Sequence, residues 1–286
     1  MPDGGGIVSG TYADADGIRL YCEETGTGYP IAFVHEFAGD TASWEPQVRY
    51  FSRRYRCIVY NARGYPPSDV PEDPDAYGQA RAADDVAAVL DRFGIGRAHI
   101  VGLSMGGFAA VHFGLRHPDR ARSLVVAGCG YGAPPETHAE FAASARANAD
   151  RIEEIGMPAF APDYSEAEAR LTLKRKDPRG FDDYLAQFAA HSTLGSAMHM
   201  RHVQGGRPSL WDFAGPLAGL PMPVLVVSGD TDGDCLETGI FLKRTVPDCS
   251  LWIAPDTGHA VNLEEPDAFN RELATFFAAA EGRSAA

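Results

Sequence analysis

The chain has 286 residues, of which 45% are hydrophobic and 22% are charged, so it has the length and composition of a folded protein with a large core. Its formal net charge of −14 predicts no nucleic-acid partner, because binding to phosphates requires a basic surface. No apolar run approaches the roughly 20 residues that span a membrane, and residues 1–10 do not have the composition of a signal peptide, so we expect no membrane partner.

The first predicted element is a β-hairpin over residues 11–25, in which polar and apolar residues alternate around a turn at Asp16 and Gly17. Six short runs that are apolar on both faces follow it along the chain. Such runs are typical of strands buried inside a parallel sheet. They cover residues 30–35, 56–60, 98–103, 123–128, 223–228 and 250–254.

Three helical patterns lie between or after these strands, at residues 77–93, 106–117 and 267–280. In the first of them, Val86 and Val89 belong to a set of apolar residues that recur at spacings of three and four, which places them on one face. Parallel neighbouring strands need crossover connections. Strands that alternate with helices therefore predict an α/β fold, with a mostly parallel doubly wound sheet.

The alternation stops between residues 133 and 210, a stretch that is rich in Ala, Glu and Arg and has no strong strand candidate. We interpret residues 133–210 as an inserted helical cap, or lid, over the carboxyl edge of the sheet. The core then consists of residues 11–132 and 211–280. The termini, residues 1–10 and 281–286, are expected to be flexible.

The strongest chemical signal is the sequence Gly-Leu-Ser-Met-Gly at residues 102–106, between a predicted strand and a predicted helix. A sharp turn there exposes the Ser104 hydroxyl, and the two glycines avoid collisions that a Cβ would cause. The first N–H groups of the helix point to where an oxyanion develops. The motif also occurs by chance, but a nucleotide-binding loop would require GKS, GKT or GxGxxG, which this segment lacks.

A serine hydroxyl needs a base to become a nucleophile near neutral pH. His259 lies in a loop between the last predicted strand and the last predicted helix, which returns it to the sheet edge that carries Ser104. We therefore predict that His259 is the base. Packing or surface roles are expected for His99 and His112, which lie in a strand and a helix, and for the three cap histidines, with contact to the substrate as the alternative for those three: His191, His199 and His202.

The base in turn needs a carboxylate that fixes its tautomer and stabilises the imidazolium. Asp230, Asp232 and Asp234 all follow one predicted strand, and the residues alone leave the choice among them open. Asp256 is so close to His259 in sequence that we interpret it as a turn residue.

With Ser104, an acid and His259 in this order, and with the elbow between a strand and a helix, the chain resembles the α/β-hydrolase fold family over about residues 11–280. In that family the acid usually stands in a G-x-x-D sequence after its strand, which implies Asp232, counted from Gly229. The resemblance also implies that the helical insertion occupies the cap position of the family.

The resemblance further implies an oxyanion hole formed by the backbone N–H groups of Phe37 and Met105. Relatives usually have glycine where this chain has Glu36. We consider two roles for this carboxylate. It forms an ion pair with Arg63, or it lies in the pocket and selects a polar or cationic group of the substrate.

The nucleophile restricts the chemistry, because haloalkane dehalogenases and epoxide hydrolases of this family use a carboxylate where the chain has Ser104. Acyl chemistry remains: hydrolysis of a small-molecule ester, lactone, thioester or amide, or of a carbon–carbon bond in a diketone. One alternative is a lyase or a cofactor-free perhydrolase with the same triad. Another is a member of the fold that binds a ligand without turnover.

The expected mechanism is that of a serine hydrolase with an acyl-enzyme intermediate, and it implies neither a metal nor an organic cofactor. Because His259 must be neutral to act as a base, activity is expected to rise with pH through the neutral range. Glu36 aside, the side chains expected at the substrate pocket come from the cap and its edge, with packing inside the cap as the alternative. They are Phe160, Tyr164, Phe188 and Trp211.

Five cysteines are widely spaced and include no CxxC pair. This pattern indicates reduced thiols rather than disulfides or a zinc site, and it favours a cytoplasmic location. We expect a small-molecule substrate and a monomer or homodimer.

Overall fold

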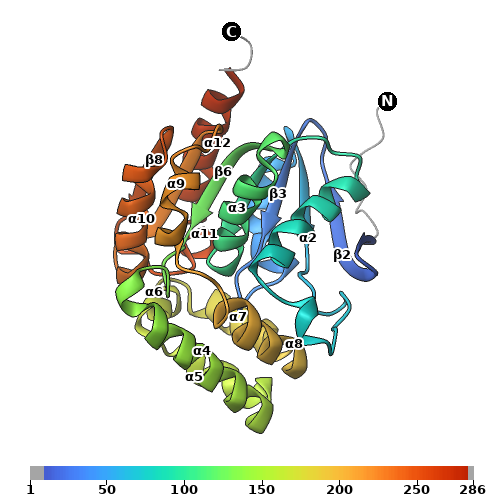
Figure 1. Cartoon of the computed structure of the whole chain (residues 1–286), viewed down its shortest axis with the longest axis vertical. Coiled ribbons are helices and arrows are strands. Elements are labelled where there is room, and N and C mark those ends of the chain that lie inside the picture. Colours follow the sequence, from blue (N-terminus) through green and yellow to red (C-terminus); the bar gives the residue numbers. More distant parts are fainter. Residues whose placement is uncertain (1–9, 283–286) are drawn as a thin grey trace.

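The computed structural model describes residues 10–282, which form an eight-stranded sheet with helices on both faces and a helical layer beyond one end (Figure 1). The order of strands across the sheet is β1-β2-β4-β3-β5-β6-β7-β8. The strands are β1 (Thr11–Ala15), β2 (Ile18–Thr25), β3 (Tyr29–Val34), β4 (Tyr55–Tyr60), β5 (Ala98–Leu103), β6 (Ala121–Ala127), β7 (Val224–Gly229) and β8 (Cys249–Ala254). The α-helices are α1 (Glu45–Phe51), α2 (Gln79–Arg92), α3 (Met105–Arg116), α4 (Pro135–Ile155), α5 (Met157–Ser165), α6 (Glu168–Lys176), α7 (Pro178–Ala189), α8 (Thr193–Met198), α9 (Ala214–Leu217), α10 (Gly233–Thr245), α11 (Val261–Glu264) and α12 (Pro266–Gly282).

The sheet is parallel except at one edge. Strands β4, β3, β5, β6, β7 and β8 pair in parallel, whereas β1 and β2 form an antiparallel hairpin that pairs with β4 through β2. The turn of the hairpin lies at Asp16 and Gly17, both of which have a positive φ. The predicted hairpin, the six further strands and the mostly parallel α/β sheet are confirmed, with small shifts at the strand ends, although β8 is a half-exposed edge strand rather than a buried one.

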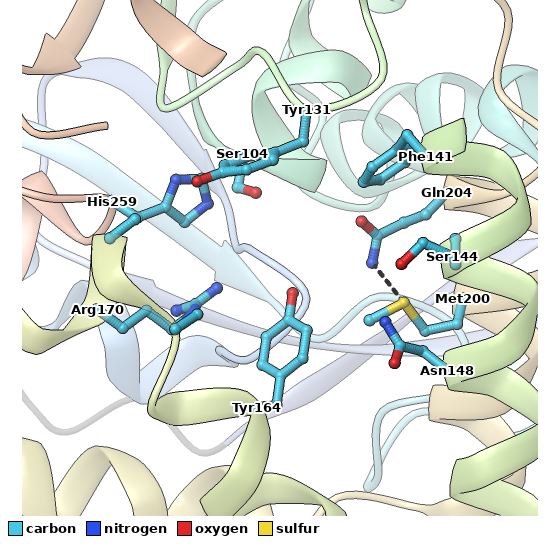
Figure 2. Close-up of a pocket in the computed structure, with 13 residues that line it drawn as sticks. Ser104, Tyr131, Phe141, Ser144, Asn148, Tyr164, Arg170, Met200, Gln204 and His259 are labelled. Carbon is cyan, nitrogen blue, oxygen red and sulfur yellow. Dashed lines mark hydrogen bonds between the residues drawn. The ribbon is translucent and has the colours of Figure 1, made fainter. Parts of the chain in front are cut away.

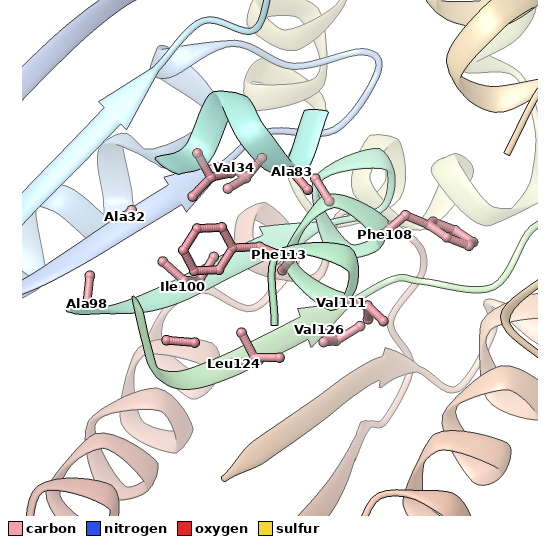
Figure 3. Close-up of a cluster of buried hydrophobic side chains, with 14 of the residues drawn as sticks. Ala32, Val34, Ala83, Ala98, Ile100, Phe108, Val111, Phe113, Leu124 and Val126 are labelled. Atoms are coloured by element: carbon pink, nitrogen blue, oxygen red, sulfur yellow. The ribbon is translucent and has the colours of Figure 1, made fainter. Parts of the chain in front are cut away.

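Both faces of the sheet are covered, which explains why its strands are apolar on both sides. Helices α2 and α3 bury one face in a cluster that contains Ile100, Val126 and Phe113 (Figure 3). Helices α1 and α12 cover the opposite face, where the rings of Phe51 and Phe277 lie 5.6 Å apart. Strand β5, which leads to Ser104, is therefore buried along its whole length.

Helices α1 and α10 were not predicted from the sequence. In α1 the buried residues are Gln47 and Phe51, and in α10 they are Cys235, Thr238, Gly239 and Leu242, so polar or small residues interrupt the apolar stripe of each helix. None of the helices in the described part of the chain combines the length and the apolar composition that a membrane span requires.

Helix α12 extends beyond the predicted end of the core. It continues to Gly282, and Nε2 of His99 donates a hydrogen bond of 3.2 Å to the carboxylate of Glu281. Residues 281–282 therefore belong to the fold, contrary to the expectation of a flexible tail from residue 281 onwards. The rest of the predicted carboxyl-terminal tail, and residues 1–9, lie outside the described residues.

Helices α4 to α8 lie together beyond one end of the sheet, within the segment interpreted as an insertion (Figure 1). Helix α4 buries Ala142, Ala145, Ala149 and Ile152, which recur at spacings of three and four residues on one face. Most of these residues belong to an apolar cluster that also contains Phe37, from the loop after β3. The helical layer is therefore packed directly on the loop that follows β3.

Candidate active site

Strand β5 and helix α3 meet in a strained turn at Ser104. This residue has φ 54° and ψ −115°, and a positive φ is uncommon for residues other than glycine. A Cβ on Gly102 would lie 2.0 Å from the carbonyl oxygen of Gly106, and a Cβ on Gly106 would lie 2.1 Å from that of Val34. Glycine is required at both positions because the chain segments of the elbow approach so closely.

Asp232 and His259 come together from different loops at the carboxyl ends of β7 and β8. A hydrogen bond of 2.7 Å joins Nδ1 of His259 to Oδ2 of Asp232, and both side chains are buried. Burial alone would raise the pKa of Asp232, but the imidazole of His259 and several hydrogen bonds lower it to about 2. Because the ionised carboxylate only accepts hydrogen bonds, Nδ1 carries the proton and Nε2 is left to act as a base.

The structure separates the three carboxylates among which the residues alone left the choice open. Oδ1 of Asp230 accepts a hydrogen bond of 3.0 Å from the backbone N–H of Thr257. Asp234 lies in the first turn of α10. Of the three, Asp232 is the one that bonds to His259.

Tyr131, which the sequence analysis did not identify, contacts both members of this pair. Its hydroxyl donates a hydrogen bond of 3.0 Å to Oδ1 of Asp232. Its ring meets the ring of His259 edge-on, with 5.4 Å between the centroids. Arg207 in turn donates a hydrogen bond to the backbone carbonyl of Tyr131. The Asp232 carboxylate is thus held at both of its oxygens.

Cys235 lies close enough to the pair to raise the question of a metal site. Its Sγ is 4.0 Å from Nδ1 of His259, and within the described residues Asp232, Cys235 and His259 form a group of possible ligands. Burial raises the pKa of the Cys235 thiol well above its ordinary value, which disfavours the thiolate that binds metals. Because Asp232 and His259 are already bonded to each other, the group fits a hydrogen-bonded pair better than a metal centre.

The loop after β3 lies against the elbow, since Gly106 is in close contact with its backbone. The carbonyl oxygen of Phe37 accepts a hydrogen bond of 2.9 Å from the hydroxyl of Tyr65. That of Glu36 accepts one of 2.7 Å from Nδ1 of His35. These bonds fix the loop, while the N–H group of Phe37 has no hydrogen-bond partner among residues 10–282.

Glu36 is paired, but not with the arginine that the sequence suggested. Its carboxylate forms a bidentate ion pair with Arg170 of α6, at 2.6 Å and 3.2 Å, and both side chains are buried. Arg63 instead binds Asp85, at 2.5 Å and 2.8 Å. The expected pair of Glu36 and Arg63 is therefore wrong, because the helical layer brings a different cation to the loop.

A cavity of about 220 Å³ opens between the elbow and the helical layer (Figure 2). Ser104 and His259 lie on one side of it, and polar side chains of α4 and of the segment after α8 lie on the other (Figure 2). The residues that line it are Ser104, Tyr131, Phe141, Ser144, Ala145, Asn148, Tyr164, Ala167, Ala169, Arg170, Met200, Gln204 and His259.

A family model described as alpha/beta hydrolase fold matches residues 29–266. The chain belongs to this family.

Three relatives of this alpha/beta hydrolase illustrate the range of the family. A 2-hydroxy-6-oxononadienedioate/2-hydroxy-6-oxononatrienedioate hydrolase of Burkholderia vietnamiensis is 26% identical over 273 residues, which are 92% of each chain. A 3-oxoadipate enol-lactonase of Acinetobacter baylyi is 27% identical over 241 residues, or 84% of this chain and 85% of the relative. The solved structure of a malate-bound thermophilic esterase from Thermogutta terrifontis has a TM-score of 0.83 and 25% identity, over 96% of this chain and 99% of that one. The chain is thus similar to hydrolases that differ in substrate.

Of the side chains expected at the pocket of this alpha/beta hydrolase, Tyr164 lines the cavity and the others do not. Phe160 and Phe188 are buried in the helical layer, where both rings pack against Tyr164. Trp211 stacks on Phe241 of α10, with 4.0 Å between the ring centroids. Sequence reasoning identified these residues as large and apolar, but packing inside the helical layer or against α10 buries such side chains as well as a cavity does.

Helix α6 links the cavity to the histidine loop, which no sequence pattern indicated. The carbonyl oxygen of Ala169 accepts a hydrogen bond of 2.8 Å from the backbone N–H of His259. A Cβ on Gly258 would lie 2.2 Å from the same oxygen. The next residue, Arg170, binds Glu36 in the loop after β3. One signal was available: a buried Glu36 requires a cation, but the sequence cannot choose among 25 lysines and arginines.

Proposed function

We propose that this alpha/beta hydrolase cleaves a small-molecule ester or lactone through a Ser104 nucleophile, a His259 base and an Asp232 orienting acid. The observation that carries the proposal is the buried hydrogen bond of 2.7 Å between Asp232 and His259, beside a cavity that Ser104 also lines. The Ser104 hydroxyl has no hydrogen-bond partner within residues 10–282, which leaves it available to a substrate. The hydrogen bond between a nucleophile and its base often shortens only when substrate binds.

In the first half of the reaction, Ser104 Oγ attacks the carbonyl carbon while Nε2 of His259 takes its proton. Asp232 stabilises the imidazolium that forms. The backbone N–H groups of Phe37 and Met105 receive the negative charge on the carbonyl oxygen. Collapse of the tetrahedral intermediate releases the alcohol, which takes the proton back from His259.

In the second half, His259 removes a proton from a water molecule that attacks the acyl-enzyme. The second tetrahedral intermediate then collapses to the carboxylic acid, and Ser104 regains its proton. Asp232 remains ionised throughout, because its pKa of about 2 lies far below neutral pH. The proton therefore moves among Ser104, His259 and the substrate.

The relatives support acyl or carbon–carbon bond cleavage, but they do not decide between them. Two of them are an enol-lactonase and a hydrolase of a 2-hydroxy-6-oxo dienedioate, and both span most of the chain. We favour ester or lactone cleavage because the steps above need no group beyond those placed around Ser104. Product analysis with a diketone, and with added peroxide, tests the carbon–carbon hydrolase, lyase and perhydrolase alternatives.

The first test is covalent capture of the nucleophile. A fluorophosphonate probe is expected to label Ser104, as identified by peptide mass spectrometry, and short p-nitrophenyl esters are expected to be turned over. The Ser104→Ala and His259→Ala variants are each expected to lose about 10⁴-fold or more in kcat. Circular dichroism and thermal unfolding serve as the folding control for both variants.

The outcome that contradicts the proposal is turnover that survives in either variant. Absence of both labelling and turnover in the native protein would instead favour a ligand-binding member of the fold.

A further inference from the structure

Within residues 10–282, the wall of the cavity contains one permanently charged side chain, that of Arg170. Its side chain is 6% exposed. Figure 2 shows the guanidinium between His259 and Tyr164, directed towards the cavity. A substrate group that enters this part of the cavity meets the Arg170 side chain.

The carboxylate of Glu36 neutralises the charge of Arg170. Nη1 and Nη2 of Arg170 donate hydrogen bonds to the two carboxylate oxygens of Glu36, at 3.2 Å and 2.6 Å, and Nη1 also donates one to the hydroxyl of Tyr184. Burial alone would raise the pKa of Glu36, but the attraction of Arg170 brings it below its ordinary value. Glu36 is therefore ionised at neutral pH, and the pair carries no net charge.

These three bonds use three of the five N–H donors of the guanidinium, which leaves one on Nη2 and the one on Nε. Nε of Arg170 has no hydrogen-bond acceptor in the described part of the chain. A neutral oxygen on the substrate, such as a carbonyl, ether or hydroxyl oxygen, satisfies this donor without bringing a charge into the cavity. A carboxylate there would lose its hydration and gain no net countercharge, which is costly in a buried site.

The rest of the wall agrees with an uncharged ligand. Facing the elbow are Ser144 and Asn148 of α4 and Gln204 of the segment after α8, all of them polar and neutral (Figure 2). They donate and accept hydrogen bonds equally well, so they hold polar groups without selecting for charge.

A second buried arginine, Arg207, gives the opposite expectation, a preference for anionic substrates. The guanidinium carbon of Arg207 lies 3.7 Å from the ring centroid of Phe108 and 4.6 Å from that of Phe141, and it has no ion-pair partner in the part of the chain that the structure describes. Burial lowers its pKa to about 10, so it is charged at neutral pH. Phe141 lines the cavity and Arg207 does not, so Arg207 acts on a ligand only through its field. If that field governed selectivity, anionic substrates would be preferred.

We propose that Arg170, with its charge cancelled by Glu36, determines specificity: its Nε donates a hydrogen bond to an uncharged oxygen of the substrate beside the scissile carbonyl, and the pair disfavours substrates that carry a carboxylate there. This inference rests on the proposed function and names the substrate class of the same site.

The hydrogen bond is tested with p-nitrophenyl methoxyacetate and p-nitrophenyl butanoate, which have similar shapes and differ in one ether oxygen. The intrinsic reactivities of the two esters cancel when the ratio of their kcat/KM values is compared between enzymes. Arg170→Met is expected to lower the methoxyacetate-to-butanoate ratio about tenfold. Arg170→Lys, which keeps the charge but lacks the Nε donor, is expected to lower it as well.

The charge is tested with the p-nitrophenyl monoester of glutaric acid and its uncharged methyl ester. The native enzyme is expected to prefer the uncharged compound. Glu36→Gln leaves Arg170 unpaired, so the charged-to-uncharged ratio of kcat/KM is expected to rise about tenfold. The Glu36→Gln, Arg170→Met double variant is expected to lose this gain, and Arg207→Met is expected to leave the native preference in place.

Two results overturn the inference: a Glu36→Gln variant with an unchanged charge ratio, or a native preference for the carboxylate that Arg207→Met abolishes. The rate of Ser104 labelling by the fluorophosphonate is measured in every variant. If the variants are still labelled and still turn over the butanoate, but their kcat/KM ratios are unaltered, the role of Arg170 is refuted and the proposed function is not. A native enzyme that shows neither labelling nor turnover refutes the proposed function instead.

Discussion

Asp232 accepts hydrogen bonds at both carboxylate oxygens, from His259 at Oδ2 and from the Tyr131 hydroxyl at Oδ1. The second bond fixes the plane of the carboxylate and so the direction in which it holds the imidazole. Tyr131 also lines the cavity, and its backbone carbonyl is bound by Arg207. We therefore regard Tyr131 as a positioning residue, which acts through Asp232.

At the scale of this residue, Tyr131→Phe is expected to lower kcat about fivefold with short p-nitrophenyl esters and to change KM little. The reason is the loss of one hydrogen bond to the Asp232 carboxylate, at a cost of about 1 kcal/mol. The pH profile of kcat/KM is measured alongside, because a merely structural role would not displace its acid limb.

Tyr77→Phe is the matched control, since the Tyr77 hydroxyl binds the carbonyl of Pro71 and Tyr77 does not line the cavity. If the Tyr131 and Tyr77 variants behave alike, Tyr131 does not position Asp232.

Among the elements, the junction of β5 and α3 depends on the closest approach of backbone segments. Gly106→Ala places a Cβ 2.1 Å from the carbonyl oxygen of Val34. Neither backbone segment can move easily to relieve this clash. We expect the free energy of unfolding to fall by more than about 3 kcal/mol, as measured by urea denaturation.

Gly96→Ala is the control for this variant, because a Cβ there has no atom within 4 Å. It is expected to change stability by less than about 0.5 kcal/mol. Equal stabilities of the two variants would contradict the steric account of the elbow.

At the scale of the whole molecule, the low pKa of Asp232 predicts how stability depends on pH. The carboxyl has a pKa of about 2 in the fold and an ordinary value of 3.8. The unfolded chain therefore takes up this proton at higher pH than the folded chain does. The contribution, up to about 2 kcal/mol, is present above pH 4 and is lost as the pH falls towards 2.

This prediction is checked by urea denaturation of the native protein and of Asp232→Asn between pH 5 and pH 2. The difference between their free energies of unfolding is expected to shrink by about 2 kcal/mol over this range, because the variant lacks the titrating group. A difference that stays constant with pH would show that the Asp232 and His259 pair does not link folding to protonation.

The sequence by itself determined the order of the strands along the chain, since runs that are apolar on both faces need a buried parallel sheet. It also determined the elbow, because only glycine fits at Gly102 and Gly106. These features are local: neighbouring residues and their spacing contain the information. Helices α1 and α10 bury polar or small residues among their apolar ones, so their apolar pattern did not predict them.

Tertiary structure alone decided which distant groups meet. It chose Arg170 rather than Arg63 as the partner of Glu36, and it brought Tyr131 to Asp232. It also buried Phe188 in the helical layer instead of the cavity. The physical reason is that a buried charge needs a countercharge and a buried ring needs neighbours, but neither requirement specifies a position in the sequence. Only the packing of the helical layer on the sheet selects the partner.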